Sequence, residues 1–167
     1  MDIHHADYQR EVYDRYIYGS AEVVGLMCLR VFVEGDDNLY RELKEPAKRL
    51  GAAFQKVNFL RDMRADYVDR GRVYFPNVIF DGFDNGMKRQ IEDEIQADFE
   101  AAREGIRSLP RGCRFGVYLA YVFYTNLFHK IRQSDAKHVM EKRIRISNMK
   151  KFLLLCTTAF KHRFFWS

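Results

Sequence analysis

Residues 55–66 place oxygen-bearing side chains and apolar side chains on different sides of one predicted helix. A helix turns by about 100° per residue, so side chains three and four positions apart share a face. Two amides and two carboxylates fall within an arc of roughly 80°. They are Gln55, Asn58, Asp62 and Asp66. The apolar side chains between them point elsewhere and are expected to pack; they are Val57, Leu60 and Met63.

This row of oxygen atoms has the chemistry of a magnesium site. Mg²⁺ takes one or two carboxylates and leaves its other positions to water and to substrate phosphates. Arg61, Arg70 and Arg72 flank the row and could neutralise the phosphates themselves. An aspartate pair at this spacing is also common on helix faces that are simply solvated. The sequence around the pair therefore has to indicate which interpretation holds, a metal site or a solvated face.

The rest of the chain also shows helical spacing, and strand signals are nearly absent. A first long helix is expected from about Tyr8 to Glu34, followed by a short helix from about Asn38. Pro46 is expected in the first turn of the next helix, which carries the oxygen row and ends near Gly71.

The second half of the chain continues the helical pattern. An acidic amphipathic helix is expected at 87–107, and an aromatic helix with apolar side chains nearly all round is expected at 113–132. Ser134 is the expected cap of a short helix that ends near Arg143, and Ser147 of the last helix. Several antiparallel helices with short connections predict one all-α bundle over residues 1–167.

Composition excludes several classes of protein. The chain has 167 residues, of which 47% are hydrophobic, which is enough for one domain with a core and too apolar for disorder. Cys28, Cys113 and Cys156 lack metal-ligand spacing and are predicted to be buried thiols of a reducing, cytoplasmic compartment. The longest apolar run, Phe115–Phe128, is too short to span a membrane. The net charge of +5 suggests an anionic partner, but no nucleic-acid motif appears, so no nucleic acid is expected.

Two segments resemble the signatures of the squalene/phytoene synthase family. The first carries Leu50-Gly51, Gln55, Asn58, Arg61-Asp62, Asp66, Arg72, Tyr74 and Pro76, and each of these positions fits the family pattern. The second runs from Tyr16 to Cys28, a tyrosine followed by small residues on a helix. It departs from the pattern at Ile17 and Glu22. Its small residues allow either close contact between helices or room for a long prenyl chain, and the two are compatible.

The resemblance implies the helical bundle of the isoprenoid (terpenoid) synthases and a head-to-head prenyl transfer. Two geranylgeranyl diphosphates would condense to phytoene through a cyclopropyl diphosphate, in carotenoid biosynthesis and with Mg²⁺ as cofactor. A squalene- or dehydrosqualene-forming synthase stays open as an alternative. Squalene formation differs from phytoene formation in that it requires NADPH.

The resemblance also assigns roles to residues by their place in the motifs. The implied metal ligands are Asn58, Asp62 and Asp66. The implied catalytic residues are Tyr16, Arg61 and Arg72. The implied substrate-binding residues are Gln55 and Tyr74, and for Tyr74 packing at the loop is the alternative role.

The family has two aspartate-rich helices that face each other, whereas Asp62 and Asp66 form the only pair at this spacing here. The resemblance covers only the C-terminal part of the family, so its N-terminal helices are expected to be missing. We expect a truncated gene, an internal start or an incomplete sequence, and a fragment that is inactive by itself. A natural half-protein with a separately encoded partner is the alternative. So is a non-catalytic remnant or subunit that binds prenyl diphosphate or membrane.

The C-terminal run from Lys150 to Trp166 mixes cations with large apolar groups. One interpretation is a docking helix with a solvated basic edge. The other is peripheral contact with an anionic membrane surface, on the inner face of the membrane, which would help to release a very hydrophobic product.

Overall fold

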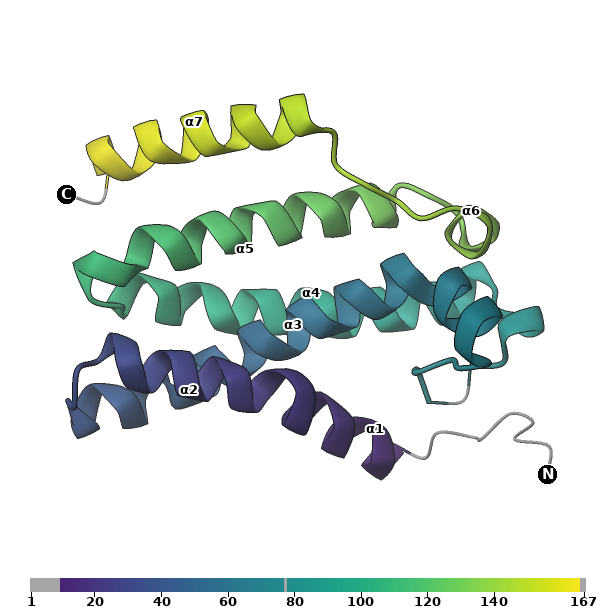
Figure 1. Ribbon diagram of the computed structural model, residues 1–167, viewed down its shortest axis with the longest axis horizontal. Helices are drawn as coiled ribbons and strands as arrows, with labels where there is room; N and C mark the ends of the chain where they lie inside the picture. Colours follow the sequence, from purple (N-terminus) through teal and green to yellow (C-terminus); the bar gives the residue numbers. More distant parts are fainter. Residues whose placement is uncertain (1–9, 77, 166–167) are drawn as a thin grey trace.

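The computed structural model describes residues 10–76 and 78–165. The elements in chain order are α1 (Arg10–Ile17), η1 (Tyr18–Glu22), α2 (Val23–Phe32), α3 (Asp37–Arg70), η2 (Phe80–Gly82), α4 (Asn85–Ser108), α5 (Arg111–Arg132), α6 (Ala136–Glu141) and α7 (Asn148–Phe165). All of these elements are helical, and no strand occurs in the described residues, so the all-α prediction is confirmed. The long helices lie side by side, with α3 and α4 between α2 and α5, and α7 beyond α5 (Figure 1).

The first helical rod consists of α1, η1 and α2 in one run from Arg10 to Phe32. Its middle part, η1, is a π-helix, a form that is rare and frequent at functional sites. The rod ends as expected where Glu34 and Gly35 adopt positive φ angles of 49° and 92°. The expected start at Tyr8 lies outside the described residues.

The expected start of a new helix near Pro46 is wrong, because α3 continues through this residue. A single helix of 34 residues begins after Asp36, whose carboxylate accepts hydrogen bonds from two backbone N–H groups, and ends at Gly71 with φ of 62°. Pro46 lies inside this helix. Its ring fits against Gly105 of α4, where an added Cβ would lie 2.2 Å from the Cβ of Pro46. Proline removes one helix hydrogen bond, and here packing between α3 and α4 outweighs that loss.

Two local expectations in the second half also change. Asp135, and not Ser134, caps α6 by accepting a hydrogen bond from the backbone N–H of His138 at 2.7 Å. The Ser134 hydroxyl instead donates to the carbonyl of Lys130, because it falls one residue before the cap position. Ser147 does cap α7, since its hydroxyl oxygen accepts from the N–H of Lys150 at 3.3 Å.

The predicted burial of the cysteines is wrong. Cys28 and Cys156 are exposed and Cys113 is half-buried, although all three are free thiols. Cys28 belongs to α2 and Cys156 to α7. Their spacing in the sequence contained no information about which helix face is covered.

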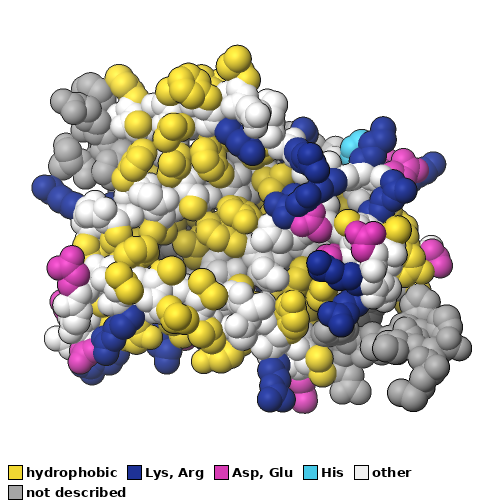
Figure 2. Space-filling view, in the orientation of Figure 1, with side chains coloured by type: hydrophobic (Ala, Val, Ile, Leu, Met, Phe, Trp, Pro, Cys, Tyr) yellow, Lys and Arg dark blue, Asp and Glu magenta, His cyan; other side chains and the backbone are white. Residues whose placement is uncertain are grey.

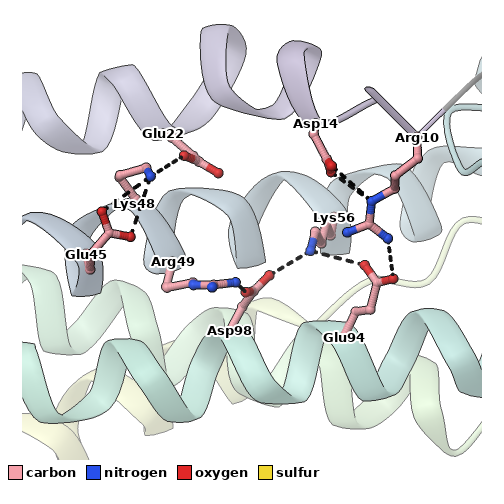
Figure 3. A network of polar contacts seen from close by, with 9 residues as sticks. All are labelled: Arg10, Asp14, Glu22, Glu45, Lys48, Arg49, Lys56, Glu94 and Asp98. Atoms are coloured by element: carbon pink, nitrogen blue, oxygen red, sulfur yellow. Dashed lines mark hydrogen bonds and ion pairs between the residues drawn. The ribbon is translucent and has the colours of Figure 1, made fainter. Parts of the chain in front are cut away.

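An ionic network with Lys56 and Asp98 buried at its centre joins α3 to α4 (Figure 3). The ammonium of Lys56 contacts Asp98 at 2.8 Å and Glu94 at 3.3 Å. Arg49 contacts the other oxygen of Asp98 at 2.9 Å, and Arg10 of α1 contacts Glu94 at 2.8 Å. Three helices therefore share one set of charges, which fixes the rotation of α3 about its axis.

Candidate functional site

Helix α3 carries the predicted oxygen row as expected. All four members are half-buried; they are Gln55, Asn58, Asp62 and Asp66. The apolar side chains between them are buried at 3% exposure or less; they are Val57, Leu60 and Met63. The helical spacing therefore separated the packed side of α3 from its polar side correctly.

Asp62 is held between two arginines. Its carboxylate contacts Arg61 Nη2 at 2.5 Å and Arg143 Nε at 2.6 Å. Arg143 follows α6 in the chain and reaches Asp62 across 81 residues of sequence. Arg61 and Arg143 also line a hollow of about 260 Å³ together with Arg64, whose guanidinium donates to the carbonyl of Glu141 at 2.5 Å. This end of the row is therefore a cationic site next to a carboxylate.

Asp66 lies one turn further along α3. Burial raises the pKa of its carboxyl group, and the charge of Arg70, which contacts it at 2.9 Å, opposes that rise. The nearby charge of Asp62 raises the pKa further. A bound cation would oppose both effects on the pKa of Asp66, because it stabilises the ionised form of the carboxylates.

Asn58 has a partner that the sequence did not indicate. The hydroxyl of Tyr124 donates a hydrogen bond to Oδ1 of Asn58 at 3.4 Å, and its ring stacks on Phe54 with centroids 4.0 Å apart. Tyr124 belongs to α5, the helix expected at 113–132 from its aromatic residues. Oxygen atoms of one amide and two carboxylates on a half-buried face fit Mg²⁺, which needs only one or two carboxylates from a protein.

Tyr16 and Tyr74 form a ring cluster beside the row. The Tyr16 ring lies 5.8 Å from that of Phe59 and 5.5 Å from that of Tyr74, and Phe59 and Tyr74 stack at 4.2 Å. Tyr74 is 6% exposed, in keeping with packing, whereas Tyr16 is 37% exposed. Arg72 is exposed beyond the end of α3. Its side chain is not among the groups that contact the row within residues 10–76 and 78–165.

An apolar cavity of about 350 Å³ extends between α2, α3, α4 and α5. Small and apolar side chains form most of its wall, including those of Val24, Ala47 and Ala120. Gln55, the first member of the oxygen row, also lines this cavity, together with Ser20. The polar row and the apolar cavity are therefore continuous along α3.

The small residues of the predicted Tyr16–Cys28 motif explain how the helices around this cavity approach each other. An added Cβ at Gly25 would lie 2.7 Å from the carbonyl oxygen of Ala47, and one at Gly51 would lie 2.6 Å from that of Ala21. Close contact between helices is therefore confirmed as one use of the motif. Gly25 also lines the cavity, so the same residue serves both uses.

Figure 2 shows how the surface divides. Arginine, lysine and acidic side chains gather around α6 and the adjoining end of α3, where the row ends. Hydrophobic side chains dominate the rest of this face, along α5 and α7. Within the described residues, no helix is long and apolar enough to cross a membrane.

The fold and the site together define an all-helical protein in which an apolar cavity meets a row of oxygen ligands suited to a cation. Comparison with known proteins identifies this class: the family described as Squalene/phytoene synthase matches residues 1–150. The chain belongs to the squalene/phytoene synthase family. Its all-helical architecture agrees with the isoprenoid-synthase fold that the resemblance implied.

Individual relatives agree with the family. The chain is 32% identical to a 15-cis-phytoene synthase from Synechocystis sp. over 180 residues, which cover 93% of this chain and 52% of the relative. It is 28% identical to a phytoene synthase from Arthrospira platensis, over 84% of this chain and 52% of the relative. A 4,4'-diapophytoene synthase from Staphylococcus haemolyticus is 32% identical over 50% of this chain. The chain spans about half the length of the phytoene synthases that it matches.

Proposed function

We propose that this chain provides the magnesium- and diphosphate-binding half of a prenyl transfer site, as the C-terminal part of one synthase domain. In the full reaction, two geranylgeranyl diphosphates condense head to head to phytoene through a cyclopropyl diphosphate, a step of carotenoid biosynthesis. The observation that carries the proposal is the continuity of the oxygen row with the apolar cavity through Gln55. A prenyl diphosphate has the matching shape, with an anionic head and a long apolar tail.

The head of the substrate would lie at the charged end of α3. Asn58, Asp62 and Asp66 would hold Mg²⁺, which neutralises the charge that develops as diphosphate leaves. Arg61 and Arg143 now contact Asp62. When a cation takes their place on the carboxylate, both guanidinium groups become available for the diphosphate oxygens, which they match in charge and in geometry.

The tail of the substrate would lie in the cavity, where apolar walls shield cationic intermediates from water. Tyr16 is proposed to contact the diphosphate or to assist the rearrangement, since its ring is partly exposed beside α3. Arg72 is proposed as a further diphosphate donor from the loop after α3. Tyr74, which is buried and stacked on Phe59, is proposed to position these groups.

A second candidate function is binding without turnover, as a subunit or a remnant. Its support is that Asp62 and Asp66 are the only aspartate pair at this spacing in the sequence, whereas the mechanism implied by the resemblance uses two such pairs. The similarity to a 4,4'-diapophytoene synthase also keeps a dehydrosqualene- or squalene-type product open.

A binding test distinguishes recognition of the diphosphate head from recognition of the prenyl tail. Calorimetric titration with geranylgeranyl diphosphate should show binding that requires Mg²⁺ and that EDTA abolishes. Inorganic diphosphate should bind more weakly, since it lacks the tail. Asp62→Asn should weaken both ligands about equally, because it acts on the metal.

A substitution in the cavity gives the complementary result. Ala120→Phe should weaken binding of geranylgeranyl diphosphate but not of inorganic diphosphate, because it fills the cavity and leaves the row intact. Ala101→Phe is the matched control, since Ala101 is exposed on α4. Binding of geranylgeranyl diphosphate that ignores EDTA, Asp62→Asn and Ala120→Phe would contradict the proposed site.

The turnover test distinguishes the two candidate functions. The chain is mixed with a separately expressed N-terminal part of a phytoene synthase, and geranylgeranyl diphosphate and Mg²⁺ are added. Prenyl transfer predicts phytoene and released diphosphate from the mixture, and little or none from residues 1–167 by themselves. No product from the mixture, with binding intact, favours the non-catalytic role.

A further inference from the structure

A hollow of about 400 Å³ lies between α5 and the start of α7, which runs along α5 (Figure 1). This size falls within the range of small-ligand sites in proteins. The α5 residues of its wall share an arc of about 100° on that helix. They are Asn126, His129, Lys130 and Gln133. Ser147 and Lys150 line the hollow from the side of α7, and among the described residues Ile146 is the only apolar member of the wall.

This α5–α7 hollow is separate from the oxygen row. Tyr124, whose hydroxyl contacts Asn58, points about half a turn away from the centre of the arc on α5. The wall is also fixed in place by the fold. Lys130 donates a hydrogen bond to the carbonyl oxygen of Arg145 at 2.6 Å, which holds the segment before α7 against α5. The hollow is therefore a second preformed polar space, on another face of α5.

The charge around the hollow has one sign. Neither α5 nor residues 142–167 contain an aspartate or a glutamate, so no carboxylate lines the wall. Within the part of the chain that the structure describes, the ammonium groups of Lys130 and Lys150 have no carboxylate partner. A concave surface lined by cations without counter-charges attracts small anions.

The wall also offers hydrogen-bond donors. Lys130 uses one of its three N–H groups on Arg145 and keeps two. The hydroxyl oxygen of Ser147 accepts from the backbone N–H of Lys150 at 3.3 Å, so its own O–H is still able to donate. His129 is exposed, and its imidazole has an N–H donor in either protonation state. A phosphate oxyanion is the ligand that accepts several such charge-assisted hydrogen bonds at once.

We propose that the α5–α7 hollow binds a small phosphate-bearing anion without a metal ion. Two exposed ammonium groups and a few donors support weak binding, with a dissociation constant on the order of 1 mM. Inorganic diphosphate should bind more tightly than inorganic phosphate, because it carries more charge and more acceptor oxygens. The single apolar residue of the wall gives a prenyl tail little to contact. The proposal is independent of the proposed function, since it uses neither the oxygen row nor the apolar cavity.

Nuclear magnetic resonance of the histidine side chains tests this proposal. The chain is titrated with inorganic phosphate or inorganic diphosphate in the presence of EDTA, which keeps Mg²⁺ from the oxygen row. The imidazole line of His129, assigned by its loss in His129→Gln, should shift and saturate with either anion. Chloride at the same ionic strength should move this line much less, because it accepts hydrogen bonds less well than phosphate.

Two adjacent lysines provide a matched pair of variants. Lys150→Gln removes one cation from the wall and should weaken diphosphate binding at least fivefold. Lys151→Gln makes the same change at an exposed neighbour on α7 that does not line the hollow, and it should bind as the wild type does. Asp62→Asn should also bind as the wild type does in EDTA, since Asp62 belongs to the oxygen row.

A carboxylate placed in the wall gives a second test. Gln133→Glu adds a negative charge to the hollow and should abolish the saturable shift of His129. Gln90→Glu adds the same charge at an exposed position of α4 and should leave the shift unchanged. Far-UV circular dichroism should be the same for all of these variants.

Three results would overturn the proposal. One is the absence of a saturable shift of His129 with both anions. Another is equal weakening by Lys150→Gln and Lys151→Gln, which would show a general effect of net charge. The third is binding that EDTA abolishes and Asp62→Asn removes, which would assign the anion to the oxygen row. None of these results alters the dependence of geranylgeranyl diphosphate binding on Mg²⁺, which tests the proposed function separately.

Discussion

Replacing Lys56 by methionine should destabilise the protein more than any exposed charge substitution. The ammonium of Lys56 lies between Asp98 at 2.8 Å and Glu94 at 3.3 Å, and the side chains of Lys56 and Asp98 are only 9% and 2% exposed. Methionine keeps the volume of the stem and removes only the charge. The change therefore tests the electrostatic role of Lys56 and not its packing.

The magnitude follows from what remains after the substitution. Removing one partner of a buried ion pair costs about 3–5 kcal/mol when the other charge is left uncompensated. Here Arg49 stays on Asp98 at 2.9 Å, and Arg10 stays on Glu94 at 2.8 Å (Figure 3). We therefore expect a smaller loss, about 2–3 kcal/mol. For a chain of 167 residues this lowers Tm by about 6–9 °C.

Thermal and urea unfolding, followed by circular dichroism, measure this loss. Lys48→Met is the matched control on the same helix, because Lys48 is more exposed and its contacts with Glu22 and Glu45 are longer, at 3.5 Å and 3.4 Å. It should cost less than about 1 kcal/mol. Equal losses for the two variants, or a loss below about 1 kcal/mol for Lys56→Met, would refute the idea that the buried network fixes α3.

Further predictions concern the site and the helix contacts. Because burial raises the pKa of Asp66, ionisation of that group opposes folding when no metal is present. Asp66→Asn should therefore raise Tm slightly at pH 7 without metal. The difference in Tm between the variant and the wild type should vanish below about pH 4. With saturating Mg²⁺ the wild type should be the more stable protein. Gly51→Ala should cost about 1–3 kcal/mol in urea unfolding, since its Cβ would meet the backbone of Ala21. Gly19→Ala should be neutral or slightly stabilising, since nothing lies within 4 Å of its added Cβ. A stabilising Gly51→Ala, or an Asp66→Asn variant indifferent to both pH and Mg²⁺, would contradict these expectations.

The sequence by itself determined the all-helical class and the polar face of α3. Apolar and oxygen-bearing residues alternate there with helical spacing, and spacing is a local property that any α-helix converts into faces. For this reason Val57 is buried and Asp62 is not, as predicted. The end of α3 at Gly71 was equally predictable, because a left-handed residue there is a local requirement. The family signature implied roles for the row, which stay predictions, and the family itself is confirmed.

Only the tertiary structure decided what meets that face. Arg143 and Tyr124 reach Asp62 and Asn58 across 81 and 66 residues, and no local spacing connects them. In the sequence, Arg143 stands between Lys142 and Arg145, and Tyr124 stands in an aromatic helix; neither pattern indicates a particular contact. The uninterrupted course of α3 through Pro46 has the same origin, because contact with Gly105 of another helix outweighs a local preference. Helical periodicity determines which way a side chain points, whereas the packing of distant helices determines which residues it contacts.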